Sequence, residues 1–363
     1  MDDDVSLLDI MQADARDQSA LYQPGEYWSR YLNRVDRGIR LRGISGFRSD
    51  TAIGRDYAGA PALDPLALVD PNKLTTRLAR WFMASPLIKS TITDRYLALV
   101  RKHFDQMHLY RSYYYEHEHA DWLSELQKEY GLPQTMVGGA IDGITIRGVS
   151  ISWFYIHHLA RIRNFSTVVD FSKVGSAFEI GGGMAATAHL LLSMFPNITK
   201  YLYVDIPPML YVGTQYLKHF FGDSVIDYRE TRSADVIRFS SDDRREIICI
   251  CPWQIERVEA RLDLFWNSAS FQEMELRAVQ NYAAHVARLT SHDARLCLYV
   301  YGEHNAAGTL SLSEIIDAFE DRFRFEPLIA QINESPLHTL SGLPEETAYL
   351  VGIAKGIQDA ADV

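Results

Sequence analysis

Two patterns of apolar and polar positions divide the chain near residue 165. In the first part, apolar residues recur at three- and four-residue spacing, which predicts helices after Ser85, at about 120–130 and at 152–163. Ser85 is a suitable N-cap because Pro86 follows it at the first helical position. Glycines among β-branched residues at 141–151 predict a short β-ribbon. The first part is therefore expected to be mainly α-helical.

From residue 176 onward, short apolar runs alternate with longer amphipathic stretches. The expected strands are 177–180, 201–204, 247–251, 263–267, 296–301, 325–329 and 348–353. Helices are expected between them at about 184–195, 209–221, 274–290 and 311–322. This alternation is typical of a parallel sheet covered on both faces. We predict an α/β fold in which a mainly α-helical domain, 1–165, precedes a Rossmann-like, doubly wound domain of seven strands, 166–363.

Composition and charge exclude several classes of protein. With 363 residues, 47% of them hydrophobic and 23% charged, the chain is an ordinary globular protein. Its 36 Lys and Arg against 47 Asp and Glu give a net charge of −11, so no nucleic-acid partner is expected. The start at Met1 with three aspartates, and the lack of an apolar run of about 18 residues, predict neither a secretory signal nor a membrane span. We expect a cytoplasmic protein.

The cysteines agree with a reducing compartment. The chain has only three, Cys249, Cys251 and Cys297, and all lie in apolar, strand-like runs. An odd number in such positions predicts buried free thiols rather than a disulfide framework.

One stretch opposes the acidic character of the whole chain. Between residues 30 and 55 the sequence contains the arginines Arg30, Arg34, Arg37, Arg40, Arg42, Arg48 and Arg55. The simpler interpretation is a solvated arm or a subunit contact. The alternative is a patch for an anionic substrate, such as a phosphorylated or nucleotide-linked sugar, because guanidinium groups bind such anions as planar forks.

The most informative segment is a glycine turn at residues 177–184. An apolar strand leads into Gly181, Gly182 and Gly183, and an amphipathic helix follows. Glycines at this junction allow a tight turn and close approach of a ligand to the backbone. Asp205 ends the next strand, 24 positions after Gly181, where its carboxylate can accept both hydroxyls of a ribose. The two features predict an adenosine-containing cofactor.

Two cofactor classes fit such a turn. Gly181, Gly183 and Ala186 satisfy the dinucleotide pattern G-x-G-x-x-G/A, so an NAD(P)-dependent oxidoreductase is one candidate. Glu179, two residues before the first glycine, would repel a pyrophosphate but attract the ammonium of S-adenosylmethionine. The position of Glu179 favours S-adenosylmethionine. The alternative is an acidic residue merely solvated at the end of a strand.

Three segments carry a resemblance to a known family. Residues 178–183 read FEIGGG, residues 204–208 read VDIPP, and residues 263–274 read DLFWNSASFQEM. They resemble successive motifs of class I S-adenosylmethionine-dependent methyltransferases. The SFQEM block, with CPWQ at 251–254 upstream, more specifically resembles the bacterial sugar O-methyltransferase family. That resemblance covers about residues 130–300 and implies methyl transfer to a hydroxyl of a sugar or glycosylated acceptor in polysaccharide or natural-product biosynthesis.

The resemblance also implies which residues hold the cofactor. The three glycines contact its amino-acid end, Asp205 binds its ribose and Ile206 flanks its adenine. Two further pairs line the adenine and sulfonium edges respectively: Pro252 with Trp253, and Asn267 with Ser268. The chain departs from the family in about twenty residues before the 247–251 strand, at 224–245, beside the expected adenine pocket.

Methyl transfer to an alcohol calls for a base close to the sulfonium. His304 directly follows the 296–301 strand, and its near-neutral reference pKa suits proton removal, so it is the preferred base. Glu273, at the expected start of a helix, is assigned as a second acid-base or substrate-binding group. Gln272 and Glu303 are expected to bind the acceptor. The alternatives are an ordinary loop histidine at 304 and a helix-dipole acid at 273.

No metal site is expected. His117 and His119 are the most suggestive pair, but on a helix they point about 200° apart. The helical first domain is expected to cover the acceptor, to support oligomerisation, or both, and a homo-oligomer stays open. A non-catalytic, cofactor-binding subunit is a third functional hypothesis.

Overall fold

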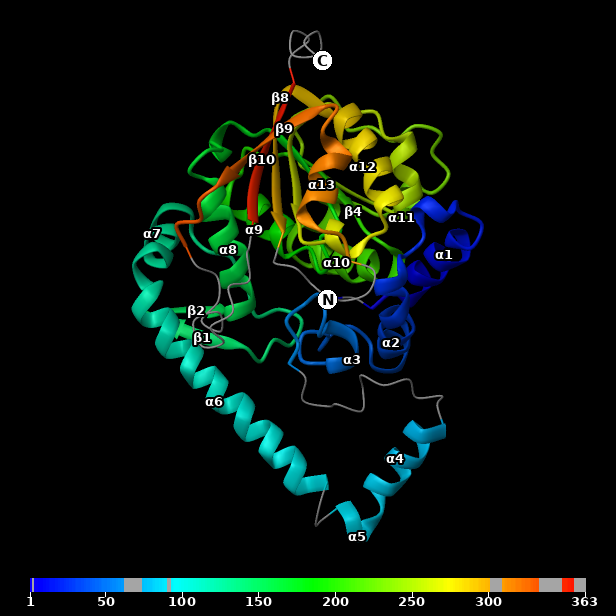
Figure 1. Cartoon of the computed structure of the whole chain (residues 1–363), viewed down its shortest axis with the longest axis vertical. Coiled ribbons are helices and arrows are strands. Elements are labelled where there is room, and N and C mark those ends of the chain that lie inside the picture. Colours follow the sequence, from blue (N-terminus) through cyan, green and yellow to red (C-terminus); the bar gives the residue numbers. More distant parts are fainter. Residues whose placement is uncertain (2, 62–73, 90–92, 301–308, 333–347, 356–363) are drawn as a thin grey trace. The chain divides into compact units, whose positions relative to one another are not determined.

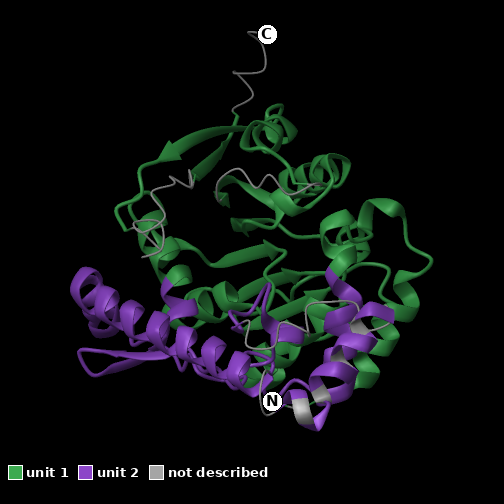
Figure 2. Ribbon diagram, turned by 60° about the horizontal axis from the view of Figure 1, so that its bottom comes forward, with its two compact units in different colours: residues 1–30, 157–363 green, residues 31–156 purple. Residues whose placement is uncertain are grey.

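The computed structural model describes residues 1, 3–61, 74–89, 93–300, 309–332 and 348–355. These form two compact units, with residues 1–30 and 157–363 in unit 1 and residues 31–156 in unit 2 (Figure 2). This division differs from the expected boundary at residue 165, because the first 30 residues join the sheet-containing unit. Tyr228 donates a hydrogen bond of 2.8 Å to Asp14, and Tyr22 donates one of 2.7 Å to Glu256. Bonds between residues more than 200 positions apart leave no trace in a local sequence pattern.

Unit 1 is built from a large sheet with helices on both sides (Figure 1). Its strands are β3 (Ser176–Ile180), β4 (Lys200–Val204), β5 (Val225–Ile226), β6 (Glu246–Ile250), β7 (Leu262–Ser268), β8 (Thr290–Val300), β9 (Phe323–Leu328) and β10 (Ala348–Ala354). Its α-helices are α1 (Val5–Ala15), α8 (Trp153–Phe165, begun in unit 2), α9 (Ala186–Met194), α10 (Pro207–Phe221), α11 (Tyr228–Thr231), α12 (Leu276–Leu289) and α13 (Leu312–Phe319). Its 3-10 helices are η1 (Ala20–Tyr22), η4 (Phe171–Lys173), η5 (Gly222–Ser224), η6 (Pro252–Arg257) and η7 (Phe271–Glu273).

The strand order is β5-β6-β4-β3-β7-β8-β10-β9. Strands β5 to β8 are parallel, whereas β10 runs antiparallel to both of its neighbours. Each of the seven expected strands is present, but the expected count was wrong because the described sheet has eight strands. The additional strand, β5, contains only two residues. Two residues are too few to show a period-two pattern, so the sequence could not indicate it.

The two faces of the sheet are distinguished by neighbouring residues of β7. Phe265 packs on Phe271, whose ring stacks on Tyr282 of α12. Trp266 points to the other face and meets Phe165 of α8 edge-on, at a centroid distance of 5.0 Å. Helices α8, α9 and α10 therefore cover one face, and α12 and α13 cover the other.

Strand β3 is the point at which the winding of the sheet reverses. From β3 the chain passes through α9 to β4 on one side, whereas β7 lies on its other side. In open α/β sheets, ligands bind at the carboxyl ends of the strands at such a reversal. A ligand site is therefore expected at the turn that follows Ile180, the last residue of β3.

The described residues of unit 2 form helices and one hairpin. The helices are α2 (Glu26–Arg42, begun in unit 1), α3 (Thr51–Gly54), α4 (Leu74–Ala84), α5 (Pro86–Ile88), α6 (Asp94–Glu118) and α7 (Ala120–Tyr130). The hairpin strands are β1 (Gly143–Ile146) and β2 (Val149–Ser152), which is the ribbon expected at 141–151. Arg147 and Gly148 connect them with φ values of 46° and 82°, as a two-residue hairpin turn requires.

Most arginines of the 30–55 stretch are bound to carboxylates. Arg40 pairs with Asp36 at 3.0 Å, and Arg42 pairs with Asp50. Arg34 pairs with Asp56, which directly follows the stretch, and buried Arg48 pairs with Asp142, which lies far from it in the sequence. These pairs argue against an anion-binding patch and for a structural role of the stretch.

Two further expectations can be compared with the described residues. Cys249, Cys251 and Cys297 are free and buried, which confirms the sequence-based prediction. No helix in the described part of the chain is long and apolar enough to cross a bilayer.

Candidate functional site

The glycine turn has the backbone conformation that its sequence suggests. Gly181 and Gly183 have φ values of 73° and 63°, in the left-handed region where glycine costs least. Ala185 follows at 65°, and α9 starts at the next residue. All three glycines are half-buried, so the turn keeps an accessible surface at the end of β3.

Several backbone N–H groups of this turn already have acceptors within the protein. Gly181 donates to the carbonyl of Val204 at 2.8 Å, and Gly183 donates to Oδ2 of Asp205 at 2.8 Å. Ala185 donates to the carbonyl of Gly182 at 3.0 Å. A pyrophosphate at such a turn depends on free N–H groups at the helix N-terminus. The three donors precede α9, which begins at Ala186, so their hydrogen bonds fix the shape of the turn and do not decide between a dinucleotide and S-adenosylmethionine.

Asp205 lies at the end of β4, beside the turn, and its side chain is buried. Its Oδ1 accepts a hydrogen bond of 2.7 Å from the N–H of Ile206, while Oδ2 binds Gly183. The hydroxyl of Tyr203 also donates to Oδ2, at 3.5 Å. A carboxylate oxygen has about two acceptor positions, so Oδ1 can accept one more donor. Burial raises the pKa of Asp205 to about 7, although the two backbone hydrogen bonds act in the opposite direction.

Glu179 lies beneath the turn and is only 1% exposed. Tyr201 donates a hydrogen bond of 3.1 Å to its Oε2, and a Cβ added to Gly182 would lie 2.7 Å from the same oxygen. Burial raises the pKa of Glu179 to about 8, and the charge of Asp205 adds to the effect. This carboxyl is therefore not solvated at a strand end, and it is mostly protonated at neutral pH.

Sequence reasoning missed the residues that hold this pair of acids. Tyr203 donates a hydrogen bond of 2.5 Å to the carbonyl of Gly183. The hydroxyl oxygen of Thr187, in α9, lies 3.0 Å from Nδ1 of His158. The side chain of Thr187 also hydrogen-bonds Glu179. The alternation of Tyr201 and Tyr203 along β4 was the available signal, since residues two apart share a face.

The end of β7 is tied to the end of β3. Asn267, which is 2% exposed, donates from Nδ2 to the carbonyl of Ile180 at 2.8 Å and to the hydroxyl of Ser270 at 2.6 Å. The half-buried Ser268 accepts a hydrogen bond of 3.1 Å from the indole of Trp266. Asn267 thus has a structural role next to Gly181, and its predicted contact with a cofactor stays a prediction.

The expected adenine side lies at the end of β6. Pro252 and Trp253 open η6, and both are buried. The ring of Tyr228, from the 224–245 insertion, meets Trp253 edge-on at 6.1 Å between centroids. Ile206 is half-buried at the start of α10. The insertion therefore supplies a wall beside Trp253, which the sequence alone did not suggest.

The structure corrects the local setting of Glu273. This residue ends η7, while α12 begins only at Leu276, so Glu273 is not the first residue of that helix. It is half-buried, and its Oε2 accepts a hydrogen bond of 3.0 Å from the indole of Trp28. The neighbouring Gln272 is buried, and its carbonyl accepts from the N–H of Leu310 at 2.8 Å. The catalytic and binding roles of this pair stay predictions.

The remaining candidates concern the base and a metal. Glu303 and His304 lie outside the described residues, after the end of β8 at Val300. His117 lies in α6, and His119 directly follows the end of that helix. Among the described residues, no group of three or more His, Cys, Asp or Glu side chains could hold a metal ion.

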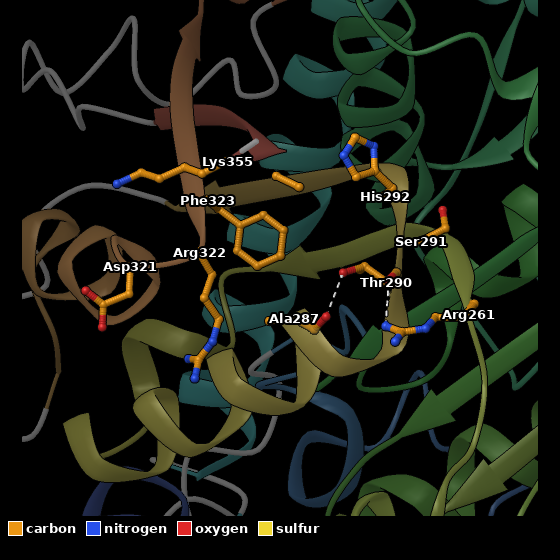
Figure 3. Close-up of a pocket in the computed structure, with 10 residues that line it drawn as sticks. Arg261, Ala287, Thr290, Ser291, His292, Asp321, Arg322, Phe323 and Lys355 are labelled. Carbon is orange, nitrogen blue, oxygen red and sulfur yellow. Dashed lines mark hydrogen bonds between the residues drawn. The ribbon is translucent and has the colours of Figure 1, made fainter. Parts of the chain in front are cut away.

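A cavity at the other end of the sheet is distinct from this site (Figure 3). Its lining includes Arg261, Arg322 and Lys355, with Phe323 between them. Arg261 directly precedes β7, so the cavity lies at the amino ends of the parallel strands. Ligands of open α/β sheets bind at the opposite ends, which leaves the glycine turn as the candidate site.

Comparison with known proteins gives weak similarities. No family model and no curated protein matches the chain. The mitomycin 7-O-methyltransferase MmcR is 15% identical, with a TM-score of 0.36 over 82% of this chain and 76% of its own. The pyocyanin biosynthetic protein PhzM is 14% identical, with a TM-score of 0.37 over 56% of each chain, so that match spans about half its length. Human N-acetylserotonin methyltransferase, solved with S-adenosylmethionine, is 13% identical, with a TM-score of 0.34 over 56% of this chain and 55% of its own.

Proposed function

We propose that this chain is an S-adenosylmethionine-dependent O-methyltransferase that methylates a hydroxyl of a sugar or glycosylated acceptor. The glycine turn, Asp205 and the SFQEM block carry the family resemblance. The arrangement around the turn supports the cofactor part of the proposal. The acceptor part rests on the resemblance alone.

One observation carries the choice of cofactor. Two buried carboxyls, Glu179 and Asp205, lie at the ends of neighbouring strands, and N–H groups of the adjacent turn are engaged within the protein. A pyrophosphate would oppose the ionisation of both carboxyls, because its negative charge destabilises an ionised acid nearby. A ligand with an ammonium and a sulfonium gains from the same carboxyls, because each opposite charge stabilises the ionised acid. The site thus favours a cationic adenosine cofactor over NAD(P).

The residues divide the work of binding. The free acceptor position on Oδ1 of Asp205 suits a ribose hydroxyl, and the hydrogen bonds that the carboxylate accepts from Gly183, Ile206 and Tyr203 hold it in place. Glu179, beneath Gly182, supplies negative potential to the turn once it ionises. Trp253 and Ile206 offer apolar surface for the adenine.

Catalysis requires alignment and removal of one proton. S-Adenosylmethionine supplies an activated methyl group on a positive sulfur. The protein has to hold the acceptor oxygen in line with that methyl, which can contribute an effective molarity of roughly 10⁵ to 10⁸ M. We assign removal of the proton of the acceptor hydroxyl to His304. Glu273 is assigned as a second acid-base or acceptor-binding group. A positioned base increases the rate by about 10² to 10⁴. Gln272 and Glu303 are assigned to the acceptor.

Calorimetric titration with S-adenosylhomocysteine tests the cofactor. We expect binding by the wild type, loss of about tenfold or more in affinity for Asp205→Ala, and no change for Asp242→Ala, an exposed carboxylate on the 224–245 insertion. Binding of NAD⁺ without S-adenosylhomocysteine would overturn the proposal in favour of the oxidoreductase. Equal affinity of the Asp205→Ala and Asp242→Ala variants would refute the role of Asp205.

Transfer of a labelled methyl group tests the reaction. Incubation with nucleotide sugars, simple glycosides and non-sugar alcohols should label only acceptors with a sugar hydroxyl. His304→Ala should lower turnover at least about tenfold with little change in cofactor affinity. Cofactor binding without transfer to any acceptor would instead favour a non-catalytic subunit.

A further inference from the structure

Helix α4 exposes a complete apolar face. Its large apolar residues Leu74, Leu78, Trp81 and Phe82 are 69%, 54%, 73% and 52% exposed. Their spacing of i, i+4, i+7 and i+8 places them within an arc of about 100° on a helix of 3.6 residues per turn. Amphipathic helices of globular proteins normally bury such a stripe, yet none of the described side chains of α4 is buried. The described residues of the chain therefore leave the apolar face of this helix uncovered.

The charges beside this face all have one sign. Between residues 74 and 93 the sequence contains Arg77, Arg80 and Lys89 and no acidic residue. Arg77 and Lys89 are exposed. Because the whole chain carries a net charge of −11, this segment is a local basic region on an acidic protein. Its charge complements a negatively charged surface.

The charge pattern disfavours a second copy of this chain as the occupant. In a two-fold symmetric dimer the same patch lies on both subunits and has to complement itself. A basic patch without acidic residues would oppose its own copy with like charges. A partner with an apolar interior and an anionic surface satisfies both features of the helix at once.

We propose that α4 is a membrane-docking helix that binds the surface of an anionic phospholipid bilayer. Trp, Phe and Leu on one face, with basic residues beside that face, are typical of helices that lie in the plane of the lipid interface. Arg77 flanks the apolar arc, and Lys89 follows the next short helix. The apolar face enters the boundary between headgroups and acyl chains, while Arg77 and Lys89 contact lipid phosphates. At about 16 Å long, the helix lies on the bilayer and does not cross it. This proposal does not depend on the enzymatic function of unit 1.

Vesicle co-sedimentation of the full chain tests the proposal. Wild-type protein should bind vesicles of mixed phosphatidylglycerol and phosphatidylcholine, and binding should fall with added salt. Trp81→Ser with Phe82→Ser should weaken binding roughly tenfold or more, and Arg77→Glu should also weaken it. The matched control is Ile329→Ser, which removes an 89% exposed apolar side chain from unit 1 and should leave binding unchanged. Circular dichroism checks that each variant is folded.

Three results would overturn the proposal. They are no binding of the wild type to anionic vesicles, equal binding to vesicles of phosphatidylcholine alone, and unchanged binding of the double variant. Sedimentation velocity tests the alternative that a second copy of the chain covers this face. If the wild type is a dimer that the double Trp81 and Phe82 variant converts to a monomer, the face belongs to a second copy of the chain.

Discussion

Replacing Glu179 by Gln tests the electrostatic description of the site most directly. Gln has nearly the same shape as a protonated Glu and keeps an oxygen that can accept the hydrogen bond from Tyr201. It cannot ionise. The substitution therefore removes the titration of Glu179 and leaves the packing beneath Gly182 almost unchanged.

The magnitude follows from the two pKa values of Glu179. Its pKa is about 8 in the folded chain, where burial is the main cause, and has the ordinary value of 4.5 when the chain is unfolded. Between pH 5 and pH 8 the folded state therefore binds more protons than the unfolded state, so the free energy of unfolding falls as the pH rises. At 1.36 kcal/mol per pKa unit, the contribution of Glu179 to the free energy of unfolding falls by about 3 kcal/mol between pH 5 and pH 8.

Urea unfolding at several pH values, followed by circular dichroism, measures this contribution. The Glu179→Gln variant should lose about 3 kcal/mol less stability than the wild type between pH 5 and pH 8. Asp205 titrates in both proteins, and its charge raises the pKa of Glu179, so the difference contains the titration of Glu179 together with its interaction with Asp205.

Glu246→Gln is the matched control. Burial raises the pKa of Glu246, but hydrogen bonds from Ser240 and Lys200 together lower it below its ordinary value. Its stabilising effect is lost only below that value, so the variant should show a constant offset between pH 5 and pH 8. If Glu179→Gln instead has the same pH dependence as the wild type, Glu179 is ionised in the folded chain and our description of the site is refuted.

Three further predictions concern cofactor binding and packing. A cationic cofactor should favour the ionised forms of Glu179 and its neighbouring acid, so affinity for S-adenosylmethionine should rise between pH 6 and pH 8; a flat profile by calorimetry would contradict this. Gly182→Ala should weaken S-adenosylhomocysteine binding and destabilise the fold by about 1 to 3 kcal/mol, since the new Cβ would lie 2.6 Å from the ring of Tyr203; wild-type urea unfolding and affinity would show that the turn adapts. Arg48→Met should destabilise the protein by about 3 to 5 kcal/mol in urea unfolding, because it leaves the carboxylate of Asp142 buried without its cation. The exposed Arg30→Met should change the same measurement by less than about 1 kcal/mol, and equal effects of the two variants would contradict the assigned burial.

Much of the fold could be predicted because it depends on local periodicity. The strands β3, β4, β6 and β7 and the helices between them agree with their expected positions to within one or two residues at most ends. Buried parallel strands are nearly continuous apolar runs, and helices repeat every 3.6 residues, so both patterns can be detected from the sequence. The glycine turn was detectable because its backbone conformation favours a particular residue type.

The parts that could not be predicted depend on contacts between distant residues. The buried Arg48 of the arginine stretch pairs with Asp142, which lies more than ninety positions further along the sequence. Residues 1–30 join unit 1 through bonds such as the one between Tyr228 and Asp14. No periodicity records such pairings, since they arise only when the chain closes on itself.

The sequence by itself determined the alternation of strands and helices, the glycine turn after β3 and the two acids beside it. Only the tertiary structure decided how those acids behave. Packing against Gly182 and Tyr201 removes Glu179 from water, and the loss of hydration raises its pKa. The chemical identity of a side chain is local, whereas its solvation and its partners belong to the folded chain.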